Sequence, residues 1–207
     1  NAILFTQDKL QNIEEFLTTL QKDVYVDKSS INGFDYRLLG GRTKELKNNT
    51  VKAMKARKTD AELEHLKDAF ARTDNAVSAI RDYIEQNDNL SEFDIAVQLA
   101  KEFKNQGAVG LSFASIVAKD KNSALAHYSK CAQDEVISDG SLVLIDCGGY
   151  FEGGLATDIT RVFVKGVPSE LQRKVYTNVL KAFLKAYNYG KIQPERPLTG
   201  FEIDQSV

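Results

Sequence analysis

Apolar residues recur every three or four positions in three long segments, and this spacing predicts three amphipathic helices. The segments cover residues 60–86, 92–103 and 169–190. Their starts carry capping side chains, which are Thr59 with Glu62, then Ser91, then Ser169 with Gln172. The predicted buried side of the first helix comprises Leu63, Leu66, Phe70, Val77, Ile80 and Ile84. The apolar side of the third comprises Val175, Val179, Leu180, Phe183 and Leu184, and Gly190 is expected to end it.

Between the second and third helices, runs rich in Val, Ile and Leu predict three strands. They cover residues 112–118, 141–147 and 158–165. Glycine pairs at 148–149 and 153–154 punctuate the connection between the last two strands, which we interpret as a hairpin. The order helix, helix, strands, helix predicts an α+β fold with an antiparallel sheet and helices on one side.

The N-terminal part of the chain has weaker patterns. Apolar spacing predicts a helix over residues 6–20 and a short strand over 24–26, whereas 29–39 is ambiguous and Gly40-Gly41 marks a break. The lysine-rich stretch 44–58 could be a nucleic-acid patch. A solvated linker and helix face is the favoured interpretation, because Glu45 interrupts the stretch and no aromatic residues alternate with the lysines. A last helix is expected to begin at Thr199.

Composition narrows the class of protein. Hydrophobic residues make up 43% and charged residues 27%, the balance of a soluble globular protein with a core. A net charge of -2 gives no pull toward nucleic acid or a membrane surface. The two cysteines cannot build a disulfide framework, and reduced thiols in a cytoplasmic protein are the simpler interpretation. The absence of an initiator Met, and an end within a helix start, lead us to expect a piece of a longer protein.

Two aspartates are the strongest candidates for chemistry. Asp146 follows four apolar residues, and Asp158 opens the next predicted strand. Paired strands would bring the two carboxylates together, and their repulsion favours a shared divalent cation. The alternative is that Asp146 starts a turn and Asp158 pairs with Arg161. From the aspartates alone this alternative is the better supported of the two.

The remaining candidate side chains have weaker support. His127 follows a predicted strand and could be a metal ligand, a proton-transfer residue or a substrate contact, although a lone histidine is more often structural. His65 lies among charged residues, and we expect it to be exposed. Cys147 should point away from Asp146, because adjacent strand residues face opposite sides. Cys131 lacks a nearby metal-binding or catalytic motif.

Four motifs together resemble the creatinase and aminopeptidase family of metallopeptidases, which includes Xaa-Pro aminopeptidase, prolidase and methionine aminopeptidase. The motifs are Leu111-Ser112-Phe113-Ala114-Ser115-Ile116-Val117, Asn122-Ser123-Ala124-Leu125-Ala126-His127-Tyr128, Leu144-Ile145-Asp146-Cys147-Gly148 and Thr157-Asp158-Ile159-Thr160-Arg161. The resemblance extends from about residue 48 to 204, and the second and fourth motifs are most similar to Xaa-Pro aminopeptidases. It places the metal interpretation of the two aspartates far above the alternative.

The resemblance implies a partial pita-bread fold over 43–207, preceded over 1–42 by the tail of an α/β N-terminal domain. It implies that Asp146 binds one metal ion, that Asp158 bridges two, and that His127 contacts substrate without being a ligand. The implied cofactors are two divalent ions, Mn with Co or Zn as alternatives. The implied activity removes the N-terminal residue from peptides with proline in the second position, in a homo-oligomer. Separately, the charge balance and the lack of a long apolar run lead us to expect no nucleic-acid or membrane partner.

The sequence departs from the family pattern in two ways. Eleven residues, 147–157, separate the two aspartates, one more than is common, which we interpret as a longer hairpin loop or a bulge. The family completes its site with one His and two Glu in later motifs, and these are expected beyond Val207. This chain should then hold at most two of five protein ligands and be inactive alone. Prolidase remains an alternative activity, and a non-catalytic peptide-binding relative is disfavoured because both aspartates are present.

Overall fold

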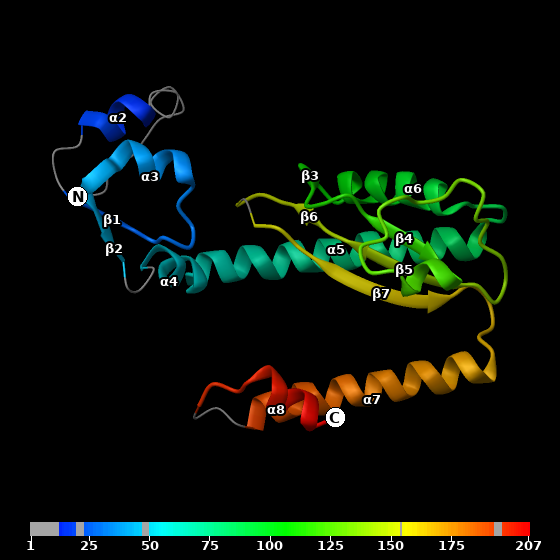
Figure 1. Ribbon diagram of the computed structural model, residues 1–207. Helices are drawn as coiled ribbons and strands as arrows, with labels where there is room; N and C mark the ends of the chain where they lie inside the picture. The colour runs from blue at the N-terminus through cyan, green and yellow to red at the C-terminus, as the bar shows by residue number, and fades with distance from the viewer. Residues whose placement is uncertain (1–12, 20–22, 47–49, 154, 193–195) are drawn as a thin grey trace. The chain divides into compact units, whose positions relative to one another are not determined.

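The structure is a computed structural model that describes residues 13–19, 23–46, 50–153, 155–192 and 196–207 (Figure 1). The chain divides into two compact units, Asn1–Thr59 and Asp60–Val207. Most of the helix predicted over 6–20 lies outside the described residues, and its described part is α2 (Ile13–Thr19). None of the helices in the described ranges is long and apolar enough to cross a membrane.

The first unit contains a small parallel β-α-β arrangement. Strand β1 (Val24–Val26) pairs in parallel with β2 (Thr43–Glu45), and α3 (Gly33–Leu39) connects them. The ambiguous segment is therefore largely helical, and Asn32 caps it by accepting a hydrogen bond of 2.8 Å from the Asp35 N–H. The predicted break is a short 3-10 turn, η1 (Gly40–Arg42), and α4 (Thr50–Ala56) follows within the lysine-rich stretch.

Two helices form one layer of the second unit, α5 (Asp60–Gln86) and α6 (Glu92–Asn105). Ser91 caps α6 as predicted, in a capping box completed by Asp94. The predicted buried side of α5 is wrong at its N-terminal end, where Leu63 and Phe70 are 42% and 38% exposed. The first buried residue of α5 is Ala69, and Phe70 lies beside the buried stripe, which continues through Thr73, Ala76, Val77, Ile80 and Ile84. His65 is exposed as expected.

A three-stranded antiparallel sheet forms the second layer, in the order β4 (Ile116–Lys119), β5 (Leu142–Cys147), β7 (Ile159–Val164). The predicted antiparallel sheet with helices on one side is confirmed, with α5 running along it in Figure 1. The strand predicted over 112–118 starts late, because the Ser112 N–H bonds to the Gly148 carbonyl outside the β4 ladder. Two short strands that the pattern missed, β3 (Gly110–Leu111) and β6 (Gly149–Tyr150), pair with each other.

The two faces of this sheet differ in what covers them. On β5 the buried residues Val143, Ile145 and Cys147 alternate with half-buried ones, and they join the core with α5 and α6. We call the opposite side the open face. Its residues follow from the strand register and are Ile116, Ala118, Leu142, Leu144, Asp146, Thr160, Val162 and Val164.

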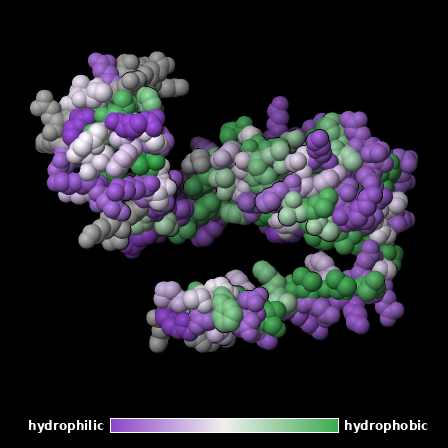
Figure 2. Space-filling view, viewed as in Figure 1, coloured by the Kyte–Doolittle hydropathy of each residue, from purple (hydrophilic) through white to green (hydrophobic). Residues whose placement is uncertain are grey.

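Helix α7 (Glu170–Ile192) follows the sheet, and α8 (Gly200–Gln205) begins after the cap Thr199, as predicted. The capping box of α7 is confirmed, because the Ser169 N–H donates to Gln172 Oε1 at 2.7 Å and the Gln172 N–H returns a bond of 3.2 Å. Gly190 does not end the helix, which continues to Ile192. Figure 2 shows the apolar side chains of α7 at the surface of the unit; they include Leu171, Val175, Val179, Leu180, Phe183 and Leu184.

Candidate metal and substrate site

Asp146 lies inside β5 on the open face, directly opposite Thr160 of β7. Its carboxylate accepts a hydrogen bond of 2.9 Å from the Thr160 hydroxyl, and this bond orients one of its two oxygens. The alternative in which Asp146 starts a turn is wrong, since the strand continues to Cys147.

Asp158 directly precedes β7, where continuation of the antiparallel register places it opposite Gly148. Burial alternates along this stretch, with Thr157 fully buried, Asp158 and Thr160 exposed, and Ile159 half-buried. Asp158 therefore shares the open face with Thr160, diagonally across from Asp146. Arg161 does not pair with Asp158 as the alternative required, because its guanidinium lies 3.3 Å from the Asp74 carboxylate of α5.

The hairpin that carries both aspartates is held closed at its base. The buried Thr157 hydroxyl lies 2.8 Å from the Thr73 hydroxyl of α5 and accepts a bond of 3.0 Å from the Gly149 N–H. At Gly148 the two backbones approach so closely that a Cβ atom would lie 1.8 Å from the Thr157 carbonyl oxygen. Glycine at 148 is thus required for the strand pairing that brings the two aspartates to neighbouring positions.

His127 lies beyond β4 and the short helix η2 (Asp120–Ala124), in left-handed backbone conformation with a φ of 57°. It is exposed, and it lines a hollow of about 310 Å³ on the open face together with Asp146 and Thr160. The hollow is completed by Ile116, Ala118, Ser123, Ala124, Leu125, Ala126 and Leu144. The structure thus brings His127 and Asp146 to one hollow, whereas Asp158 is not among its lining residues.

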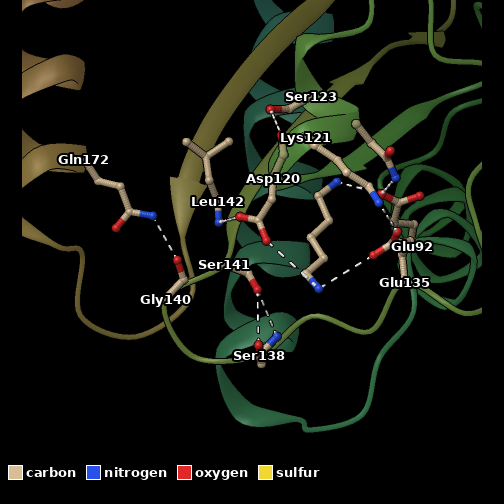
Figure 3. A network of polar contacts seen from close by, with 12 residues as sticks. Glu92, Asp120, Lys121, Ser123, Glu135, Ser138, Gly140, Ser141, Leu142 and Gln172 are labelled. Atoms are coloured by element: carbon tan, nitrogen blue, oxygen red, sulfur yellow. Dashed lines mark hydrogen bonds and ion pairs between the residues drawn. The ribbon is translucent and has the colours of Figure 1, made fainter.

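A buried carboxylate that the sequence pattern did not indicate holds the segment that lines part of this hollow. Glu92, in the first turn of α6, is fully buried and accepts hydrogen bonds from the segment that carries His127. Figure 3 shows Glu92 in a polar network that also includes Asp120 and Leu142. An acidic residue in a first helical turn is common, because it complements the helix dipole, and the sequence signal was therefore not distinctive.

The two cysteines differ in burial, since Cys147 is buried and Cys131 is half-buried. Cys147 is fully buried on the side of the helices, so the prediction that it points away from Asp146 is confirmed. Burial, together with the nearby carboxylates Asp146 and Asp158, raises the pKa of the Cys147 thiol to about 12. Burial also raises the pKa of Cys131.

The donor atoms of the open face fit part of a site for hard divalent cations. Asp146 and Asp158 present carboxylate oxygens, which such ions prefer, at the ends of two paired strands. Within the described part of the chain, no group of three or more His, Cys, Asp or Glu side chains gathers as a complete site would require. The two aspartates therefore need further ligands before they can hold an ion firmly.

Comparison with known proteins places these residues in a family. The model of metallopeptidase family M24 matches residues 64–206. Xaa-Pro dipeptidase from Pyrococcus horikoshii is 31% identical over 189 residues, covering 89% of this chain and 52% of that protein. The probable Xaa-Pro aminopeptidase P of Leptosphaeria maculans is 30% identical over 211 residues, covering 97% of this chain and 32% of that protein. The chain thus spans about half the length of the first of these relatives and about a third of the second.

Solved structures agree with the sequence comparison. An Xaa-Pro dipeptidase from Bacillus anthracis superposes with a TM-score of 0.76 at 28% identity, over 94% of this chain and 54% of that one. An X-Pro aminopeptidase from Thermotoga maritima gives a TM-score of 0.70 at 26% identity, over 88% and 52%. These likenesses confirm the expected partial α+β pita-bread fold. The chain belongs to metallopeptidase family M24, a family of hydrolases that depend on divalent metal ions.

Proposed function

We propose that Asp146 and Asp158 are this chain's contribution to a dinuclear metal site. In this proposal the whole protein removes the N-terminal residue from peptides with proline in the second position. The observation that carries the proposal is the placement of both aspartates on one face of one β-hairpin, with His127 beside the first. Diagonal partners on paired strands lie about 7–8 Å apart at Cα, which suits two ions about 3.5–4 Å apart.

Each residue has a distinct role in the proposal. Bound divalent ions, Mn with Co or Zn as alternatives, would supply activation of a water molecule and polarisation of the scissile carbonyl. Asp146 would contact one ion and Asp158 both, while the Thr160 hydroxyl keeps the Asp146 carboxylate in a fixed orientation. His127 would donate a hydrogen bond to the substrate at the edge of the hollow. One His and two Glu from the remainder of the parent protein would complete the ligand set.

The proposal extends to the organisation of the parent protein. Residues 43–207 would form the first part of its pita-bread domain, and residues 1–42 would be the end of a preceding N-terminal domain. The parallel pair β1 and β2 with α3 between them is consistent with such an α/β domain end. We further propose that the full-length protein is a homo-oligomer.

Xaa-Pro dipeptidase activity is the second candidate, and the names of the Pyrococcus horikoshii and Bacillus anthracis relatives favour it. The two activities share the reaction and differ in substrate length. A comparison of turnover on an Xaa-Pro dipeptide and on a longer Xaa-Pro peptide separates them. Turnover of the dipeptide alone would assign the prolidase activity, and turnover of the longer peptide would assign the aminopeptidase.

The test of the metal site uses the full-length protein after removal of bound metal. Titration with Mn followed by calorimetry should show two ions bound per chain, and Asp146→Asn and Asp158→Asn should each lower this number. Asp74→Asn is the matched control, because Asp74 is an exposed aspartate of α5 that pairs with Arg161. Two ions bound by the Asp146→Asn, Asp158→Asn double variant with unchanged affinity would show that the metal site lies elsewhere.

A further inference from the structure

We propose that Glu92 is a positioning residue whose carboxylate holds the segment 119–132 in the conformation that presents His127 to the hollow beside Asp146. The inference rests on the proposed function for the role of His127, and it adds a residue on a different element, the first turn of α6.

Glu92 accepts four hydrogen bonds, and all four donors belong to this one segment. Its Oε1 atom accepts from the Lys119 N–H at 2.7 Å and from Asn122 Nδ2 at 2.9 Å. Its Oε2 atom accepts from the Tyr128 hydroxyl at 2.7 Å and from the Ala132 N–H at 2.9 Å. The donors stand on both sides of His127 in the chain, so the carboxylate closes the segment into a loop around one point.

The carboxylate is held in its ionised form by these donors. Glu92 is fully buried, and the ion pairs of the described chain include none to it, so no cation neutralises the charge directly. Burial by itself raises the pKa of a carboxyl group, but the four hydrogen bonds outweigh it and leave the pKa of Glu92 below its usual value. The N-terminus of α6 adds the positive end of a helix dipole. A buried charge satisfied only by one segment ties that segment firmly to the helix.

The backbone conformation of the segment 119–132 is one that such hydrogen bonds would stabilise. His127 and Asp120 both have left-handed φ angles, of 57° and 43°. This conformation is uncommon for residues other than glycine, although Asp and His adopt it more readily than most, and contacts that hold it stabilise the loop. Tyr128, the residue after His127, is fixed by its bond to Glu92. At the other end the Asp120 carboxylate accepts a bond of 2.8 Å from the Leu142 N–H, visible in Figure 3. The loop is therefore anchored both to α6 and to β5, the strand of Asp146.

Substitution by glutamine tests the charge with little change in shape. A carboxylate accepts at both oxygens, whereas the amide group of glutamine accepts at one and donates at the other. With the amide nitrogen in place of Oε2, the Ala132 N–H would face a second donor. With the nitrogen in place of Oε1, the Lys119 N–H would face a second donor instead. Glu92→Gln therefore loses at least one backbone anchor in either orientation.

The experiment uses the full-length, metal-loaded protein and a double-mutant cycle with His127→Ala. Glu92→Gln should lower kcat/KM on an Xaa-Pro peptide by roughly 10- to 100-fold, with the loss divided between kcat and KM as in His127→Ala and with metal content unchanged. In the His127→Ala background the same substitution should have almost no further effect. Amide hydrogen exchange over 119–132 should become faster in Glu92→Gln. Glu102→Gln is the control, since among the described residues this α6 carboxylate bonds only to Gln98 and Asn105 of its own helix.

Several outcomes decide between this inference and its rivals. Equal losses from Glu92→Gln with and without His127 would overturn it, because Glu92 would then act independently of the histidine. Unchanged exchange over 119–132 would also overturn it. Should Glu92→Gln fail to fold, Tyr128→Phe removes a single donor and must show a smaller loss with the same dependence on His127. If His127→Ala is fully active while exchange in Glu92→Gln accelerates, the proposed role of His127 fails and Glu92 remains the anchor of the loop.

Discussion

The two faces of the β4-β5-β7 sheet come from the same short strands yet have opposite properties. On β5, Val143, Ile145 and Cys147 are completely buried against α5 and α6. Their neighbours Leu142, Leu144 and Asp146 are half-buried and lie on the open face. Because side chains alternate along a strand, one six-residue segment contributes to the hydrophobic core and to the candidate metal site at once. Folding stability and chemistry are thereby assigned to alternate positions.

The difference explains how a carboxylate is tolerated at the end of a strongly apolar strand. An aspartate on the covered face would lose its hydration inside the core, at a cost of several kcal/mol unless it were paired. On the open face Asp146 keeps contact with solvent and receives the Thr160 hydroxyl. We therefore expect substitutions on the open face to change activity and substitutions on the covered face to change stability.

The largest expected effect is the loss of activity in Asp146→Ala of the full-length protein. Removal of this proposed metal ligand should reduce kcat/KM on an Xaa-Pro peptide about a thousand-fold, or about 4 kcal/mol of transition-state stabilisation. The free energy of unfolding without metal should stay nearly unchanged or rise, because a carboxylate that repels Asp158 has been removed. Steady-state kinetics and chemical denaturation of the metal-free protein measure the two quantities. A loss of stability as large as the loss of activity would break the assignment of Asp146 to the chemical face.

The reverse result is expected for Ile145→Ala on the covered face. Ile145 is completely buried in the core that the sheet forms with α5 and α6. Its truncation should lower the free energy of unfolding by about 2–5 kcal/mol. The number of metal ions bound by the folded protein should not change. Leu144→Ala, the neighbouring residue on the open face, is the matched control and should cost less, because Leu144 is only half-buried. Equal costs would mean that another part of the parent protein covers the open face.

The sequence predicted the features that depend on local pattern. The alternation along β5, the hairpin to β7, the capping of α6 and α7 and the shared face of the aspartates all follow from residues close together in the chain or in one motif. The apolar stripe of α5 showed which side faces the core. It did not show that Leu63 and Phe70 are exposed, because exposure depends on what packs against each turn of α5 and not on its periodicity.

Features that depend on distant partners were missed for identifiable reasons. Strands β3 and β6 have two residues each and include glycine, so they carry no periodic signal. Glu92 looks like any acidic residue in a first helical turn, and only the fold brings the segment 119–132 onto it. The role of Gly148 was equally hidden, since the sequence marked a turn there and the structure shows close packing of two backbones.

Gly148 provides a third test, with a smaller expected effect, of the hairpin formed by β5 and β7. In Gly148→Ala the new methyl carbon would lie 1.8 Å from the Thr157 carbonyl oxygen, and the backbone must shift to accommodate it. We expect a loss of about 1–3 kcal/mol in the free energy of unfolding and weaker binding of Mn, because the shift displaces Asp158. Gly110→Ala is the control, since nothing lies within 4 Å of a Cβ atom at that position. Equal stability of the two variants would contradict the close approach seen at Gly148.

The smallest expected effect is a pH dependence of stability that arises from Glu92, in the first turn of α6. The folded protein holds the pKa of Glu92 below its ordinary value of 4.5, so the unfolded chain takes up the proton more readily. The contribution of Glu92 to the free energy of unfolding is therefore complete above about pH 4.5 and is lost as the pH falls through the folded-state pKa.

Glutamine does not titrate, so the stability difference between the wild type and Glu92→Gln should shrink on going from pH 7 to pH 3. Chemical denaturation at a series of pH values measures this difference. Tyr128→Phe retains the carboxylate but removes one of its four donors, and it should show the same acid-linked loss with a smaller amplitude. If the difference in free energy of unfolding between the wild type and Glu92→Gln stayed constant down to pH 3, the four donors would not favour the ionised carboxylate. The side chain at position 92 would then hold the His127 loop through its shape and not through its charge.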